Sequence, residues 1–388
     1  MIRQILFHGL WILTLVFFSV LKISGGSTTH AGEMVGIQIN LESLSFVPGW
    51  PLLAGSGTHS LSERIVLKGI SLPASRGVIY FWSTENGRLD DFVPFSKEVL
   101  PKHFDISQDG ARMVVIFSDY TQKEKKSFWL GCYSLMEKRW LWKSRWGSED
   151  NEPPDAVKFL PSGRSILTLG YFSVWYYDAE TGHRIDERKG VLKEYPVYRW
   201  ALRSRYVSPS GRYLVIWQEK PYEGIAWGVN KFVTVWDLPA SKEVARWRKP
   251  GYECQIATFS PDEQSVVFGC KDGYIREWSI KNQSLVRELK TSAEVLSVMF
   301  SPNGKYLAVN SGIKDITVFD YATLRKLHDS YSPGRNYPVP VGEQYPMVFS
   351  ADGESMALWD RGRICLYSTA NWEQKWCVVP TPPDLPKK

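Results

Sequence analysis

The sequence predicts an all-β fold, a seven-bladed β-propeller made of four-stranded antiparallel blades. One turn signature recurs along the chain, strand-like apolar runs flank its copies, and 17 Trp, 19 Tyr and 18 Phe are spread throughout. Repeats of about 40–50 residues with about four strands each are typical of propeller blades. Successive copies of the turn lie 41 to 61 residues apart and end at Gly49, Gly110, Gly163, Gly211, Glu263, Gly304 and Gly353.

The repeat is clearest in residues 254–279. Two apolar runs flank a Ser-Pro-Asp turn at 260–262, and an Asp-Gly turn at 272–273 leads into a third run that reaches Trp278. This order is typical of three consecutive antiparallel strands. We therefore expect each of the seven turns to lie between the first and second strands of its blade. One blade cannot bury both of its faces, so the blades are expected to stack radially into a closed ring.

Three segments, residues 234–237, 259–278 and 300–320, resemble the WD-repeat family in their turns and in the strand that ends with Trp-Asp or a similar pair. The resemblance covers residues 40–380, and it implies that connections between blades, and between second and third strands, emerge on one face. Asp272 and Trp278 match the turn Asp and strand Trp of the family's buried hydrogen-bond network. Only residues 236–237 form a true Trp-Asp pair, and the Gly-His pair that usually precedes a blade is absent.

Residues 1–31 are predicted to be an export segment that forms a hydrophobic helix. Arg3 precedes an apolar run at 5–21, and small residues follow at 24–27, which is the layout of an export signal. Cleavage would make it a signal peptide, whereas an uncleaved run would be a membrane anchor. Both alternatives place the propeller, residues 34–380, outside the cytoplasm, either periplasmic or extracellular or tethered to a membrane. A polar Pro/Lys tail, residues 381–388, follows.

The first blade, residues 34–90, is expected to be irregular, with a strand at 34–39 and later strands at 65–70 and 78–82. The last blade is expected to end near residues 376–379. The ring then closes without exchanging a strand, or residues 34–39 pair with the last blade and latch it. The strands of the second and third blades are expected at 104–107, 113–117, 128–134, 140–146, 157–159, 166–169 and 174–177.

Three long connections, residues 187–205, 218–230 and 329–346, are rich in Arg and aromatic residues. The WD-like arrangement would gather them, with the basic run at 123–126, on one face, which we call the loop face. Loops on a rigid scaffold often carry binding sites, and Arg and aromatic residues are enriched at binding hot spots. Solvated loops, with Trp200 or Trp227 tucked into the propeller, are the alternative. The candidate partner-binding residues are Tyr198, Arg199, Trp200, Tyr222, Trp227, Arg335 and Tyr337.

The sequence predicts no catalytic residue, no cofactor and no metal. It contains no Gly-x-Ser-x-Gly elbow, no His-Glu-x-x-His pair and no phosphate loop. An acidic run at 149–152 could bind calcium, but its spacing fits no known calcium loop and two prolines follow it, which favours a solvated acidic loop. The turn at 178–182 resembles part of the repeat in pyrroloquinoline-quinone dehydrogenases, although Asp-x-x-Thr-Gly also suits any hairpin. Four histidines fall in four different blades: His59, His103, His183 and His328.

These observations favour a non-catalytic binding scaffold that acts outside the cytoplasm through its loop face. The alternative is a propeller enzyme, a hydrolase, lactonase or quinoprotein-like protein, with its site at the central channel. A structural module of an envelope assembly is a third possibility. The net charge is +6, too mild to predict nucleic-acid binding. We expect a protein partner, a monomeric propeller, and contact with a membrane only through an uncleaved N-terminal segment.

Cross-strand disulfides are predicted at Cys254–Cys270 and Cys365–Cys377, with Cys132 left free. The members of each pair are symmetric about a predicted turn, so they should lie opposite each other with side chains on the same face. An export segment makes an oxidising compartment plausible. Pairs of buried thiols are the alternative, and a one-residue slip in either turn would place the partners on opposite faces.

Overall fold

The computed structural model describes fourteen stretches of the chain, and every regular element in them is a β-strand. The predicted export segment and the C-terminal tail lie outside these stretches. No helix among the described residues is long and apolar enough to span a membrane. The described residues are 38–60, 65–67, 70–72, 75–95, 99–119, 127–146, 156–170, 173–189, 207–221, 229–248, 254–311, 315–331, 347–360 and 363–379.

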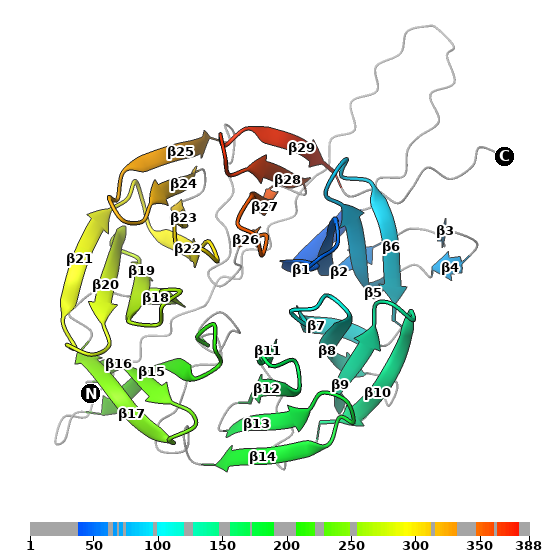
Figure 1. The fold of residues 1–388 in the computed structure, drawn as a ribbon, viewed down its shortest axis with the longest axis horizontal. Coiled ribbons are helices and arrows are strands. Elements are labelled where there is room, and N and C mark those ends of the chain that lie inside the picture. The colour runs from blue at the N-terminus through cyan, green and yellow to red at the C-terminus, as the bar shows by residue number, and fades with distance from the viewer. Residues whose placement is uncertain are drawn as a thin grey trace, which may run out of the picture. The chain divides into compact units, whose positions relative to one another are not determined.

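The strands form seven sheets arranged radially in a ring, which we number as blades 1 to 7 in chain order (Figure 1). The first three blades have four strands each. Blade 1 contains β1 (Gln38–Phe46), β2 (Leu52–Ser60), β5 (Ser75–Ser83) and β6 (Leu89–Pro94); blade 2 contains β7 (Val99–Ile106), β8 (Arg112–Asp119), β9 (Ser127–Ser134) and β10 (Arg139–Arg145); blade 3 contains β11 (Ala156–Phe159), β12 (Ser165–Leu169), β13 (Ser173–Asp178) and β14 (Arg184–Lys189).

The remaining blades repeat this order. Three strands of blade 4 are described, and Val207 forms an isolated bridge with Leu214 where its innermost strand would lie. Blade 4 contains β15 (Tyr213–Pro221), β16 (Val229–Asp237) and β17 (Lys242–Arg248); blade 5 contains β18 (Cys254–Phe259), β19 (Ser265–Cys270), β20 (Tyr274–Ser279) and β21 (Leu285–Lys290); blade 6 contains β22 (Val295–Phe300), β23 (Tyr306–Ser311), β24 (Asp315–Asp320) and β25 (Lys326–Tyr331); blade 7 contains β26 (Met347–Phe349), β27 (Ser355–Asp360), β28 (Arg363–Ser368) and β29 (Gln374–Val378).

The seven predicted turns lie between first and second strands, as expected. The last residue of each has a left-handed backbone, with φ between 57° at Glu263 and 76° at Gly211. A serine in five of the turns fixes this geometry, because its hydroxyl oxygen accepts a hydrogen bond from the backbone N–H five residues later. In the first of these turns the Arg112 N–H donates to Ser107 Oγ at 2.9 Å. The same bond recurs at Ser208, Ser260, Ser301 and Ser350.

The turns between third and fourth strands form a second repeat, which the sequence analysis missed. Each contains one residue with positive φ, and each is followed by a β-bulge near the start of the outermost strand. The bulge is at the second residue of that strand in five blades and at the third residue in blades 2 and 4. Four or six residues separate the last paired positions of the two strands, so these loops are longer than the three-residue hairpin loop in which a left-handed residue itself forms the bulge. The left-handed residues are Gly87, Lys138, Gly182, Ser241, Gln283, Leu324 and Trp372. The bulged residues are Asp90, Leu141, Ile185, Val244, Val286, Leu327 and Lys375.

Two expectations about blade boundaries were wrong. Residues 65–70 do not form a blade strand, since β3 (Ile65–Leu67) and β4 (Ile70–Leu72) pair only with each other. They lie in an insertion between β2 and β5. Each has three residues, which is too short to span a blade. The connection at 218–230 is also shorter than expected, because β15 and β16 stay paired as far as Pro221 and Val229.

The ring closes without strand exchange among the described strands. Blade 1 uses β1, β2, β5 and β6, and blade 7 uses β26 to β29. Ile39 pairs with His59 inside blade 1, so the described end of the 34–39 run does not latch the last blade. Closure instead depends on apolar packing, in which Leu44, Phe46 and Trp82 of blade 1 share a cluster with Ile364 and Leu366 of blade 7.

Candidate functional site

The topology places the ends of three predicted connections at the same end of their blades. In an antiparallel meander the second and fourth strands run in the same direction. Therefore β14, β15 and β25 all end on one face (Figure 1). This is the loop face of the sequence analysis. The candidate partner-binding residues themselves lie outside the described residues: Tyr198, Arg199, Trp200, Tyr222, Trp227, Arg335 and Tyr337.

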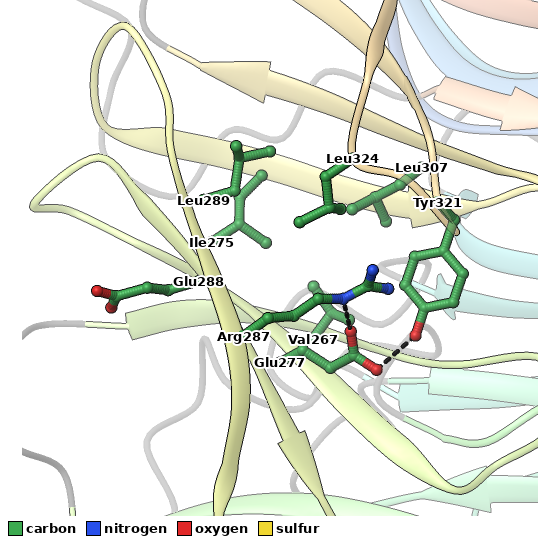
Figure 2. Close-up of a pocket in the computed structure, with 9 residues that line it drawn as sticks. All are labelled: Val267, Ile275, Glu277, Arg287, Glu288, Leu289, Leu307, Tyr321 and Leu324. Atoms are coloured by element: carbon green, nitrogen blue, oxygen red, sulfur yellow. Dashed lines mark hydrogen bonds and ion pairs between the residues drawn. The ribbon is translucent and has the colours of Figure 1, made fainter.

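A pocket within the described residues lies between blades 5 and 6. Figure 2 shows Arg287 and Glu277 of blade 5 pointing toward Tyr321 of blade 6, with leucine side chains beside them. Its empty volume, including the open mouth, is about 240 Å³. The pocket is lined by Val267, Ile275, Glu277, Arg287, Glu288, Leu289, Leu307, Tyr321 and Leu324.

The Glu277 carboxylate is the centre of a hydrogen-bond network in this pocket. Its side chain is 10% exposed, and it accepts bonds from Ser265 Oγ at 2.7 Å, Tyr321 Oη at 2.5 Å and Arg287 Nε at 2.6 Å. The Arg287 guanidinium also lies 4.3 Å from the centre of the Tyr321 ring and donates to the carbonyl of Ala322 at 3.3 Å. Both carboxylate oxygens are therefore used, and the network connects blades 5 and 6.

The electrostatics keep this carboxylate ionised. Burial raises the pKa of Glu277, but the hydrogen bonds from Tyr321, Ser265 and Arg287 outweigh burial and leave it below its usual value. Burial and the bond to Glu277 raise the pKa of the Tyr321 hydroxyl. An ionised, fully bonded carboxylate is a poor proton donor or acceptor near neutral pH. The pocket is thus best explained as a clamp between two blades.

The Asp272 position, which matches the WD-repeat network, has a different partner here. Arg276 donates to Asp272 from Nη1 at 3.1 Å and from Nη2 at 2.7 Å, and these bonds lower the pKa of the carboxyl group. Trp278 instead packs against Trp247, with ring centres 5.8 Å apart. A bidentate ion pair inside blade 5 therefore uses the turn aspartate.

The enzyme alternative would need acidic or metal-ligating side chains gathered at one site among the described residues. Within them, no three His, Cys, Asp or Glu side chains are grouped as metal ligands would be. Asp105 on the innermost strand of blade 2 accepts the backbone N–H of Phe159 in blade 3 at 2.7 Å, so it joins two inner strands. The Asp178 carboxylate accepts the N–H of Thr181 at 2.7 Å, which is ordinary hairpin chemistry. The acidic run at 149–152 lies outside the described residues.

The four histidines stay in separate blades. His59 is in β2, His103 in β7 and His328 in β25, while His183 follows a turn of blade 3. His328 packs against Tyr367 and Trp372 of blade 7, with ring centres 5.9 Å and 6.0 Å away, and burial lowers its pKa. This histidine is part of the packing between blades 6 and 7.

The structure joins Cys254 to Cys270 and Cys365 to Cys377. Cys132 is free and buried, and burial raises its pKa to about 11. The strand register that brings Cys254 opposite Cys270 is not a regular one. The hairpin register pairs Ile256 with Gly269, which alone would place Cys254 one position out of line. A bulge at Gln255 restores the alignment, so Cys254 lies opposite Cys270.

No model of a known protein family matches the chain, but the chain is similar to several known proteins. The chain is 23% identical over 249 residues to a U3 small nucleolar RNA-associated protein 18 homolog of Arabidopsis thaliana, a match covering 62% of the chain and 41% of that protein. It is 32% identical over 101 residues to small ribosomal subunit protein RACK1 of Candida albicans, covering 26% of the chain and 31% of that protein.

WD repeat-containing protein 1 of Bos taurus is 31% identical over 111 residues, which are 28% of the chain and 17% of that protein. The chain thus spans less than half the length of each of these relatives. They give no support to the exported, quinoprotein-like subtype of propeller. The seven antiparallel blades, the recurring turns and these similarities together support a WD-repeat β-propeller.

Proposed function

We propose that this protein is a non-catalytic interaction scaffold that binds protein partners through the loop face of its propeller. The observation that carries the proposal is the common direction of β14, β15 and β25, whose ends lead into the three connections rich in Arg and aromatic residues. Side chains of these types supply large contact area and charge-assisted hydrogen bonds at interfaces. The propeller would present them from a rigid frame.

The names of the relatives support a scaffold. One is called a small ribosomal subunit protein and another is associated with a small nucleolar RNA, so both names describe members of larger assemblies. The net charge of +6 on 388 residues is mild for direct contact with nucleic acid. We therefore propose a protein partner for this chain, and the channel enzyme is not favoured.

Residues 1–31 support a further proposal, that the propeller acts outside the cytoplasm. Arg3 followed by the apolar run at 5–21 has the layout of an export signal. Fusing residues 1–40 to a reporter that is active only outside the cytoplasm tests this. An active fusion is expected, and a fusion that is expressed but inactive would refute export while leaving the scaffold proposal intact.

The scaffold proposal is tested by replacing Trp200 and Trp227 together with alanine in the full chain and identifying captured proteins by mass spectrometry. We expect proteins captured by the unaltered chain to be lost, because truncating a buried hot-spot aromatic typically costs about 2 kcal/mol or more, roughly thirtyfold in affinity. Circular dichroism and thermal unfolding must first show an intact fold.

The matched control changes large exposed apolar side chains at the other end of the blades. Met136 and Ile185 are 64% and 58% exposed; Met136 lies in the turn between β9 and β10, and Ile185 is the bulged residue at the start of β14. Met136→Ala with Ile185→Ala should capture the same proteins as the unaltered chain. The loop face is the wrong surface if the control loses the partners or if the Trp200→Ala/Trp227→Ala variant retains them.

A further inference from the structure

The two ends of the described ring meet where blade 7 packs against blade 1. No described strand crosses between these blades, so side chains must provide the contact. The Trp376 indole Nε1–H on β29 donates to the carbonyl of Thr84 at 2.8 Å, in the turn that joins β5 to β6. A Cβ atom built on Gly87 would lie 2.9 Å from atoms of both Trp376 and Val378, which shows how closely β29 approaches that turn.

The strand that makes this contact has few other constraints. β29 has five residues and is the outermost strand of its blade, so it pairs only with β28. Four residue pairs join the two strands, and a bulge at Lys375 interrupts them. Outer strands with so few partners are the first elements to open in local unfolding.

The disulfide Cys365–Cys377 ties this strand down beside its contact residue. Cys365 lies on β28, Cys377 on β29, and the two are direct cross-strand partners. Cys377 follows Trp376 in the sequence, so the covalent bond is one residue from the indole that reaches blade 1. Cys377 is partly exposed, which allows a thiol reductant to approach its sulfur.

We propose that the Cys365–Cys377 disulfide is a redox-sensitive latch for ring closure. A dithiol reductant attacks one sulfur and forms a mixed disulfide, and its second thiol then displaces the protein sulfur. The protein gains two electrons and two protons as two thiols, and the reductant leaves as a cyclic disulfide. Without the cross-link, β29 is retained by four residue pairs, and its contact with Thr84 and Gly87 loosens.

The second disulfide provides an internal comparison. Cys254 and Cys270 join β18 to β19 in blade 5, and both residues are buried. β19 also pairs with β20, and the residues of β18 and β19 share clusters with blades 4 and 6. Reduction of this bond leaves both strands packed between neighbouring blades, so it should not affect the contact between blades 7 and 1.

Hydrogen exchange of the full chain measures the latch directly. We expect Cys365→Ala/Cys377→Ala to accelerate exchange about tenfold or more in residues 374–378 and 83–91, since local opening no longer strains a covalent cross-link. Cys254→Ala/Cys270→Ala, which removes the same number of sulfur atoms, should leave those segments as protected as in the unaltered chain.

Reduction of the unaltered chain with dithiothreitol separates bond cleavage from the loss of side-chain volume. It should reproduce the faster exchange in both segments, and it should change nothing further there in Cys365→Ala/Cys377→Ala. Equal protection of β29 with and without the bond would overturn the proposal. So would free alkylation of Cys365 and Cys377 in the native protein before reduction.

Discussion

Blades 5 and 6 share a buried polar network in addition to an apolar cluster, whereas the described residues of blades 7 and 1 meet through apolar packing and an indole hydrogen bond. In the first interface Glu277, Arg287 and Tyr321 connect consecutive blades. The backbone also runs directly from β21 to β22 through four residues, 291–294. In the second interface Trp376 approaches Thr84 from the other end of the described chain, and no such short connection joins the blades.

The two interfaces differ in which interaction supplies their stability. Where the backbone already connects two blades, a buried ion pair adds mainly orientation, because desolvation offsets much of its attraction. Where the chain ends meet, apolar contact has to supply the association itself, since burial of apolar area is the main favourable contribution. The three predictions below test this contrast, from the largest expected effect to the smallest.

Glu277→Ala should destabilise the protein most, by about 3 kcal/mol, because it leaves Arg287, Tyr321 and Ser265 without their common acceptor. Chemical unfolding followed by tryptophan fluorescence measures the change. Glu288→Gln is the matched control on the neighbouring strand. The Glu288 side chain is 48% exposed, and its ion pair with Arg276 Nε is long, at 3.4 Å. Removing its charge should therefore cost less than about 1 kcal/mol of stability. Equal effects of the two changes would contradict the clamp.

Gly87→Ala should destabilise ring closure by about 2 kcal/mol, from a left-handed backbone and an added methyl group against Trp376 and Val378. Gly49→Ala is its control. Gly49 has a similar φ of 75°, but a Cβ atom there would have no neighbour within 4 Å. It should therefore cost only the backbone term, about 1 kcal/mol. The difference in melting temperature between the two variants isolates the contact between blades 7 and 1. Equal melting temperatures would show that this contact contributes little to stability.

Acidification should weaken the clamp between blades 5 and 6 and leave the apolar closure unchanged. The pKa of Glu277 is below 4.5 in the folded protein, so its ionic contribution is present above about pH 4.5 and is lost as the pH falls further. The difference in unfolding free energy between the unaltered chain and Glu277→Gln should shrink over that range. The cost of Gly87→Ala should stay constant. If the difference in unfolding free energy between the unaltered chain and Glu277→Gln does not depend on pH, the Glu277 carboxylate does not contribute to the clamp through its charge.

The sequence could predict the turns that require a special backbone. A glycine marks six of the seven turns between first and second strands, and the surrounding Ser-Pro-Asp pattern marks the seventh, at Glu263. In contrast, Lys138, Gln283 and Leu324 adopt the same left-handed backbone at outer hairpins. No local signal marks these residues, because hairpin closure and packing impose the conformation on side chains that do not favour it.

The pocket between blades 5 and 6 could not be predicted as a unit. Glu277 and Tyr321 are 44 positions apart, and only radial stacking brings them together. One weak signal existed: Glu277 follows Ile275 and precedes Trp278 in a strand, and a carboxylate in such a run needs a partner. The two cysteine pairs could be predicted from the sequence, because hairpin symmetry limits which cysteines lie opposite each other. The bulge at Gln255, which aligns the first pair, could not be predicted. The loop-face residues stay a prediction.

The bulge near the start of every outermost strand has a consequence for the rim of the ring. Seven outer strands expose backbone groups along one edge, and such edges can recruit strands from other molecules. Each bulge removes one residue from the regular pattern and twists the strand locally, so a foreign strand finds no long, flat ladder to extend. The rim thus discourages sheet-to-sheet polymerisation even where apolar side chains such as Ile185 and Val286 are more than half exposed.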